Sequence, residues 1–184
     1  MHPLLDKYLC DKFPKLLSER NKPMQETCMC WGFECGDGWF YLIQSLCAAV
    51  QHRIDSRLEE IVNYDKYYPG GKGKDGKDAP YPKPEPIEQV VFSQVKEKFG
   101  GLRIYYSGGD EFIHGMFSLA ESMSYAICEE CGTTESVGTT KGWITVTCAK
   151  DARHPEHLQP NDDTELQAIW KTIKNEQLPK APTT

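Results

Sequence analysis

Apolar and polar residues alternate on both sides of Gly100-Gly101, which predicts a β-hairpin within residues 90–107. If these two glycines form the turn, Lys98 lies opposite Arg103 on the neighbouring strand. One face of the hairpin is then apolar apart from Glu97 and carries Val91, Val95, Phe99, Leu102, Ile104 and Tyr106. The other face is polar and carries Gln94, Lys96, Lys98, Arg103, Tyr105 and Ser107. The apolar face predicts that the hairpin packs against a core.

Two longer stretches, residues 37–62 and 110–127, have apolar residues at helical spacing. A shorter amphipathic helix is expected within residues 3–20, with a break at Pro14. Residues 65–86 contain so many glycines, prolines and charges that they predict an exposed loop.

These patterns together predict an α+β fold, in which a small antiparallel sheet centred on the hairpin is packed by two main helices. Residues 1–127 would form this core domain and residues 128–157 a zinc-ribbon-like cysteine segment. Residues 158–184 would hold a last helix and a tail, because Thr164 and Gln167 fit a capping box. The apolar stripe of that last helix is Leu166, Ile169, Trp170 and Ile173.

Length and charge restrict the class of protein. The chain of 184 residues is long enough for one domain with a small appendage, and its net charge of -6 argues against a protein that coats nucleic acid. It has no apolar stretch long enough to span a membrane, and its first residues do not resemble a signal peptide. We therefore expect a cytoplasmic protein whose 8 cysteines are thiols or metal ligands.

The helix predicted at 37–62 is longer than a small core needs. Its far end is expected to pack on a second subunit in a homodimer. The alternative is a long helix that lies across one sheet.

A metal site is indicated by Cys128-Glu-Glu-Cys131-Gly132, which has the spacing of a zinc knuckle. Cys148 follows a predicted strand at ribbon spacing and supplies a third thiolate. Three thiolates and one more protein ligand leave no open position, so a structural zinc ion is expected rather than a catalytic one. The alternative is a set of reduced cysteines without metal.

The fourth zinc ligand has three candidates, which are Asp151, His154 and His157. We favour His154, because imidazole suits zinc better than a lone carboxylate beside three thiolates. The cysteines of a second cluster, Cys28, Cys30 and Cys35, are spaced too tightly for a knuckle and are interpreted as buried thiols.

The polar face of the hairpin predicts an anion site. Lys96, Lys98 and Arg103 would repel one another unless an anion lay between them, and a phosphate would meet that need. Ser107 and Gly109 lead into a helix start, where free N–H groups favour phosphate. The base of a nucleotide could stack on one of two aromatic rings, Tyr105 or Trp39. The alternative is that carboxylates of the same chain, or water, neutralise this face.

Four motifs of the chain resemble a widespread, largely uncharacterised family of small phage and prophage proteins. They are E-C-G-D-G-W at 34–39, V-K-E-K-F-G-G-L-R-I-Y-Y-S-G-G-D at 95–110, C-E-E-C-G at 128–132 and G-W-I at 142–144. The family often ends its cysteine segment with C-x-x-C or C-x-x-H, whereas this chain has Cys148-Ala-Lys-Asp151. The loop at 65–86 resembles an insertion. The resemblance implies a protein that acts on a bacterial host.

The first functional hypothesis is a non-enzymatic phage protein that sequesters an anionic nucleotide signal and so counters host defence. The second is a zinc-stabilised adaptor that binds a host protein through the Trp- and Cys-rich surface around residues 28–40. A third is an enzyme that cleaves such a nucleotide, although no catalytic constellation is visible and His114 is expected to be structural or exposed rather than catalytic. Nucleic-acid binding through the cysteine segment is disfavoured, because residues 128–157 hold few cations.

Overall fold

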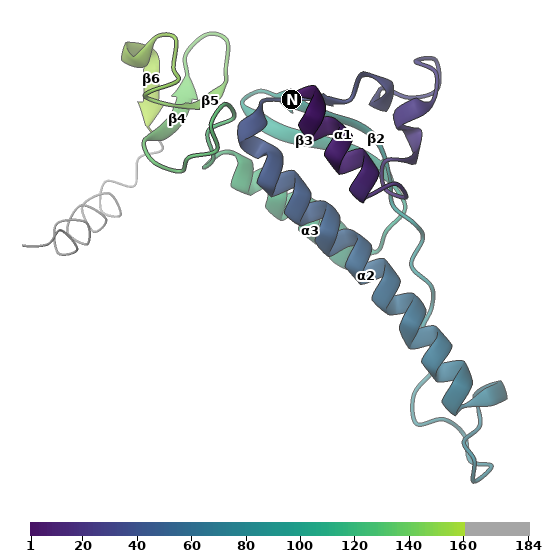
Figure 1. Cartoon of the computed structure of the whole chain (residues 1–184). Helices are drawn as coiled ribbons and strands as arrows, with labels where there is room; N and C mark the ends of the chain where they lie inside the picture. The colour runs from purple at the N-terminus through teal and green to yellow at the C-terminus, as the bar shows by residue number, and fades with distance from the viewer. Residues whose placement is uncertain (161–184) are drawn as a thin grey trace, which may run out of the picture.

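The computed structural model describes residues 1–160 and has three α-helices and two small sheets, as Figure 1 shows. The class predicted from the sequence, α+β, is confirmed. In chain order the helices and strands are α1 (Pro3–Lys12), β1 (Phe33–Glu34), α2 (Phe40–Tyr67), β2 (Val91–Lys98), β3 (Gly101–Ser107), α3 (Glu111–Ser124), β4 (Val137–Thr140), β5 (Val146–Cys148) and β6 (Leu158–Pro160). The helix expected at 164–173 lies outside the described residues.

The main sheet has the order β1-β2-β3, with the predicted hairpin as its two long strands. Its third strand, β1, pairs parallel to β2, with Phe33 opposite Val95, so the sheet is mixed and not purely antiparallel. A strand of two residues carries no alternation that a sequence pattern could reveal. Its Phe33 is nevertheless buried against the core.

The predicted register of the hairpin is wrong by two residues. The turn is Phe99-Gly100, both with positive φ (56° and 80°), and Lys98 lies opposite Gly101. Gly101 lies in β3, where a Cβ atom would be 2.5 Å from the Tyr125 hydroxyl oxygen, so the strand requires glycine at this position. A shift of two residues keeps the side chains between Gln94 and Ser107 on their predicted faces, apart from the turn. Phe99 leaves the apolar face, because it lies in the turn, and its side chain is 70% exposed.

A bulge at Ser93 changes the start of β2. Because the extra residue reverses the alternation, Phe92 is fully buried and Val91 is only half-buried. The sequence pattern placed Val91 on the core face, which is wrong for this reason.

Helix α2 is longer than predicted, with 28 residues that continue into the expected loop as far as Tyr67. Its first half packs on the core through Ile43, Leu46, Cys47, Val50 and Ile54. Its second half projects from the body together with the following loop (Figure 1), and there Leu58 and Val62 are exposed. Helix α3 is shorter than the predicted 110–127; Asp110 caps it, and it contacts both α2 and β3.

Helix α1 ends just before Pro14, so the predicted break is confirmed. The second sheet, in the order β5-β4-β6, is antiparallel and carries the cysteine segment. It lies at the end of the body where α2 begins and α3 ends (Figure 1). The two sheets thus meet the helix pair at one junction, and the candidate metal ligands lie there.

Candidate metal centre and apolar groove

Four metal-ligating side chains of the cysteine segment come together. Cys128 and Cys131 lie on the loop after α3, whereas Cys148 ends β5 and Asp151 follows it. Their ligand atoms all lie within 4.8 Å of one another. The Sγ atoms of Cys131 and Cys148 are 3.8 Å apart, and the Cys128 and Cys148 Sγ atoms are 3.5 and 3.2 Å from Asp151 Oδ2. Bonds of about 2.3 Å to sulfur and about 2.0 Å to oxygen in a tetrahedral zinc site give S–S and S–O separations of about 3.8 and 3.5 Å. The four side chains therefore fit a metal ion.

The fourth member of the cluster is Asp151, one of the three candidates, whereas His154, which the sequence favoured, lies outside it. The backbone N–H groups of Asp151 and Ala152 both donate to the Cys148 carbonyl, and this turn folds the carboxylate back toward the thiols. His154 lies beyond the turn and groups instead with Glu156 and His157. The sequence argument considered only ligand preference, whereas the tight turn after β5 decides which side chain returns.

Hydrogen bonds link the thiols and the carboxylate of the cluster, and they shift the pKa values of these groups. Burial alone would raise the pKa of Cys128, but backbone N–H groups of residues 131, 148 and 130 point at its sulfur, and its pKa is lowered. The pKa of Cys131 is raised to about 12, first because its thiol donates a hydrogen bond to Asp151. The same bond, with that from Cys148, lowers the pKa of Asp151. A divalent ion would take the place of these shared protons.

The loop that carries Cys128 and Cys131, called here the metal-ligand loop, packs directly on the residues that precede α2. Gly38 N–H donates to the Glu129 carbonyl at 2.7 Å, and Gly36 N–H donates to Glu129 Oε1 at 2.9 Å. A Cβ atom at Gly38 would lie 2.2 Å from the Cys128 carbonyl oxygen, so only glycine allows this approach. Trp39 is fully buried, and its Nε1–H donates to the Ile127 carbonyl at 3.0 Å. The motif E-C-G-D-G-W is thus the surface on which the cysteine loop lies.

The predicted anion site has a different arrangement. Arg103 pairs with Glu121 at 3.0 Å and donates to the Tyr125 hydroxyl at 3.2 Å. Lys96 lies opposite Arg103, and its Nζ is 5.2 Å from the centre of the Tyr105 ring. Lys98 is exposed, and its Nζ lies over the ring of Phe99. The structure thus brings Lys96, Arg103 and Tyr105 onto one face, with the arginine already neutralised by the chain.

Groups at the helix start expected to bind phosphate already form hydrogen bonds and an ion pair within the chain. Gly109 N–H donates to the Glu88 carbonyl at 3.0 Å. The Asp110 carboxylate accepts the Ile113 N–H at 2.9 Å and pairs with Arg53 at 3.1 Å. Ser107 is exposed, and Trp39 is buried and so cannot stack on a base. His114 is exposed, and its Nδ1 forms a 2.7 Å hydrogen bond with the Tyr106 hydroxyl.

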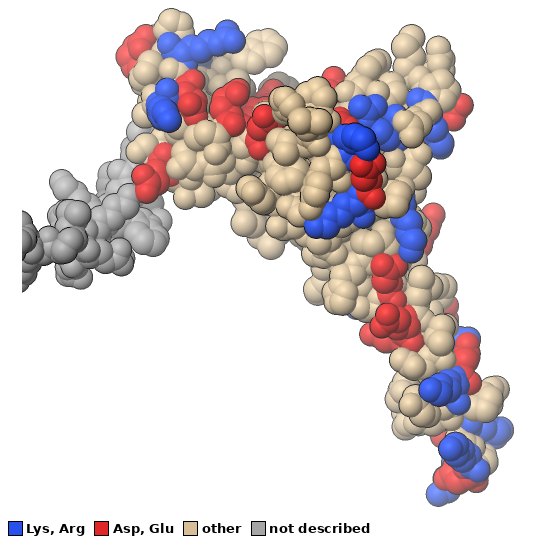
Figure 2. Space-filling view, in the orientation of Figure 1, with Lys and Arg blue, Asp and Glu red and all other residues tan. Residues whose placement is uncertain are grey.

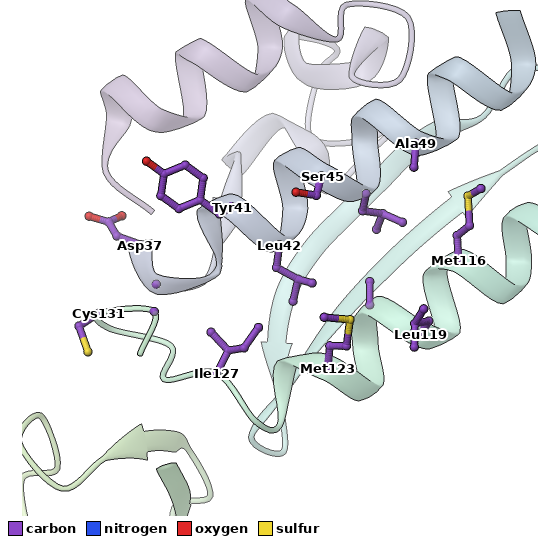
Figure 3. A pocket seen from close by; sticks show the side chains of 14 residues that line it. Asp37, Tyr41, Leu42, Ser45, Ala49, Met116, Leu119, Met123, Ile127 and Cys131 are labelled. Carbon is purple, nitrogen blue, oxygen red and sulfur yellow. The ribbon is translucent and has the colours of Figure 1, made fainter. Parts of the chain in front are cut away.

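An apolar groove that the sequence did not predict runs between α2 and α3, as Figure 3 shows. It has a volume of about 690 Å³. Its lining is Asp37, Gly38, Tyr41, Leu42, Ser45, Leu46, Ala49, Met116, Leu119, Ala120, Met123, Ile127, Cys131 and Gly132. Met123 is 47% exposed at the groove. The unusually wide apolar stripe of α3, which continues to Leu119, was the available signal.

The second cysteine cluster is only partly as predicted. Cys35 is buried, whereas Cys28 and Cys30 are half-buried. Within residues 1–160 these cysteines belong to none of the groups that could hold a metal.

Fold and site together define an α+β protein with a cysteine-rich candidate metal centre beside an apolar groove. No family model, no curated protein and no solved structure matches the chain. None of the helices within residues 1–160 has both the length and the apolar character needed to cross a membrane.

Proposed function

We propose that this chain is a zinc-stabilised binding protein that holds an amphipathic helix of a partner protein between α2 and α3. The observation that carries the proposal is the groove of about 690 Å³ with its apolar lining. Around it, Tyr41 and Leu119 are 76% and 62% exposed. This corresponds to the adaptor hypothesis, with the binding surface moved from residues 28–40 to the groove.

The exposed side chains favour a macromolecular partner. Contiguous apolar surface on a soluble protein costs solvation free energy, and such surface commonly marks an interaction site. Methionine side chains such as Met116 and Met123 adapt to differently shaped apolar groups. A groove between two helices also has the shape of a third helix, which would present residues at i, i+3, i+4 and i+7.

Charge indicates the chemistry of that helix. Asp37 is the only lining residue with a formal charge, and it lies at the end of the groove beside Cys131 (Figure 3). Glu129 and the exposed Glu130 are on the adjoining loop, and Figure 2 shows acidic side chains gathered over this junction. The partner helix should therefore carry Lys or Arg at the end that lies near Asp37. A second copy of this chain fits less well, because two concave faces do not fill one another.

The metal centre would prepare the groove for its partner. Cys131 and Gly132 line one end, and both belong to the loop that the metal would hold. A structural zinc ion fixes such a loop before the partner arrives, which lowers the entropy cost of binding. The resemblance to phage proteins suggests that the partner belongs to the bacterial host.

Titration with model helices tests the proposal. The first is a 14-residue helical peptide with leucine at i, i+3, i+4 and i+7 and with lysine at both ends. The second is identical except that glutamate replaces each lysine. Methyl NMR spectra of methionine report the site. We expect the lysine peptide to shift the Met116 and Met123 signals, and the exposed Met24 and the buried Met29 to stay unchanged.

Two matched variants complete the test. Leu119→Asp should weaken binding of the lysine peptide at least tenfold, since it places a carboxylate in an apolar site, although it adds an attractive charge. Val62→Asp, at a similarly exposed position on the projecting half of α2, should bind normally. Equal binding by both variants, or a dimer that Leu119→Asp dissociates, would overturn the proposal.

Anion binding is a second candidate with one supporting observation. Lys96 and Lys98 have no carboxylate partner at ion-pair distance within residues 1–160, and they extend from one face of the hairpin. A nucleotide-type phosphate could neutralise both, as the sequestration hypothesis requires. The two lysines, rather than Arg103, would then be the residues to test.

A further inference from the structure

Three side chains outside the cysteine cluster form a separate group of metal-ligand type. They are His154, Glu156 and His157, and their ligand atoms lie within 4.8 Å of one another. All three are exposed. His154 Nδ1 is 3.1 Å from Glu156 Oε1, and the two imidazole rings have centroids 5.4 Å apart at an interplanar angle of 31°.

The local backbone explains why these side chains meet. Pro155 begins a 3₁₀ turn that ends at His157, and His157 N–H donates to the His154 carbonyl at 2.9 Å. In a 3₁₀ turn, side chains at i and i+3 lie one above the other. The fixed φ of Pro155 restricts this turn before any ligand binds. Both imidazoles are therefore held on one side of a short, constrained turn.

We propose that His154, Glu156 and His157 bind a second divalent transition-metal ion, of the zinc class, at an open site. Two imidazoles and one carboxylate suit zinc, nickel or copper better than calcium or magnesium, which prefer oxygen ligands alone. The hydrogen bond between His154 and Glu156 already places a nitrogen and an oxygen on the same side. Three protein ligands leave at least one coordination position for water or for a donor atom of another molecule.

The second site differs from the first in its ligand types, in the exposure of its ligands and in its position along the chain. It contains no thiol, all three of its ligands are exposed whereas Cys128 and Cys148 are buried, and it lies at the 3₁₀ turn of Pro155–His157. It gives a role to the two histidines that follow Cys148 in the segment although neither belongs to the cysteine cluster. Since its ligands are exposed, we expect it to bind zinc more weakly than the cysteine site.

Zinc titration of the full chain tests the inference. Protein that already carries one equivalent of zinc would be titrated with zinc chloride in a calorimeter, and the bound metal would be counted by elemental mass spectrometry. The wild-type chain should take up a second equivalent, and His154→Gln/His157→Gln should not. His52→Gln, at an exposed histidine on α2, is the matched control and should retain both equivalents.

Two spectroscopic readouts keep the test decisive. Cobalt bound at the cysteine site gives a thiolate charge-transfer band, and that band should be the same in the double variant, which shows that the variant is folded. In NMR spectra, the second equivalent of zinc should shift the ring signals of His154 and His157 but not those of His52. Equal zinc uptake by the wild type and the double variant, or shifts at His52 instead, would overturn the inference.

Discussion

The backbone N–H of Gly38 donates to the carbonyl of Glu129 across 2.7 Å, and this bond joins the start of α2 to the metal-ligand loop. No other residue type fits there, because a Cβ atom at Gly38 would lie 2.2 Å from one carbonyl oxygen and 2.4 Å from the Gly132 nitrogen. These neighbours are backbone atoms, which cannot rotate away as a flexible side chain would. The groove, the cysteine loop and the first turn before α2 therefore depend on one another.

Replacement of Gly38 should weaken the packing of the metal-ligand loop on the turn before α2. Gly38→Ala is expected to lower the free energy of unfolding by about 1–3 kcal/mol, the usual cost of overpacking. Gly115→Ala on α3 is the control: its Cβ meets nothing within 4 Å, and alanine should stabilise the helix by about 0.5–1 kcal/mol. Urea unfolding of both variants measures the difference. Equal stability of the two variants would contradict the close approach at Gly38.

A buried hydroxyl joins α3 to the hairpin. Ser124 is fully buried; its Oγ accepts the Leu102 N–H at 2.9 Å and donates to the Glu121 carbonyl at 2.6 Å. Ser124→Ala would leave the Leu102 N–H without an acceptor and should cost about 1–3 kcal/mol. Ser122→Ala, at an exposed serine of the same helix, should change stability by less than about 0.5 kcal/mol. Thermal unfolding of the two variants would reveal no such contrast if the hydroxyl were dispensable.

The sequence predicted those parts of the fold that repeat a pattern. The hairpin, both main helices and the break near Pro14 follow from periodicity and turn chemistry. The register was missed because two adjacent glycines can serve either as turn or as strand, and here Gly101, close to Tyr125, belongs to the strand. The three cysteines of the candidate metal cluster were predicted from their spacing, whereas Asp151 depends on a turn that no spacing rule describes. The groove depends on how far apart α2 and α3 lie, which only the packed structure determines.

Charge reversal on the hairpin should separate structural from binding roles. Arg103→Glu would face Glu121 and leave the Tyr125 hydroxyl without its guanidinium, so it should destabilise the fold by about 1–3 kcal/mol. Lys98→Glu is exposed and should change stability by less than about 0.5 kcal/mol. Chemical unfolding checks this contrast, and equal effects would remove the structural role of Arg103.

Anion binding must for that reason be tested with the lysines alone. If the second candidate function is correct, Lys96→Glu/Lys98→Glu should abolish calorimetric binding of cyclic nucleotides or ADP-ribose while the fold is kept. Lys72→Glu/Lys77→Glu, on the distant loop, should bind as the wild type does. An absence of heat with the wild-type chain, or unchanged binding by the Lys96/Lys98 variant, would reject anion binding.

The metal centre predicts an ordered series of zinc affinities. Asp151→Ala should lower the affinity for zinc more than tenfold, since even an outer-shell partner contributes about 10–100-fold. His154→Ala should leave the cysteine site unchanged, because His154 is not part of it. Competition with a chelating dye measures both variants. A loss of affinity in His154→Ala equal to that in Asp151→Ala would restore the histidine as the fourth ligand.

Zinc binding at the cysteine site should also release protons. The pKa of Cys131, raised to about 12 first by its hydrogen bond to Asp151, means that its thiol is protonated at neutral pH in the absence of metal. Zinc binds the thiolate, so the affinity should fall as the pH is lowered. Calorimetry in buffers of different ionisation enthalpy should therefore show at least one proton released per zinc. Proton-neutral binding would show that Cys131 is not a ligand.

Glu129 predicts a pH dependence of stability at the same junction. Burial raises its pKa, the Gly36 N–H acts against this, and the carboxylates of Glu97 and Glu130 add to the rise. A carboxyl group whose pKa is higher in the folded state favours folding most while it is protonated, and this contribution is lost as the pH rises through the folded-state pKa.

Glu129→Gln keeps an oxygen that accepts the Gly36 N–H but carries no charge. It should therefore unfold at a higher temperature than the wild type at pH 7, and this advantage should vanish below the ordinary glutamate pKa of about 4.3. Glu130→Gln, at the exposed neighbouring carboxylate, should show no comparable gain. If Glu129→Gln were less stable than the wild type at neutral pH, the charged carboxylate would be stabilising the contact between the metal-ligand loop and the residues before α2. The cost of burying that charge would then not be the larger effect.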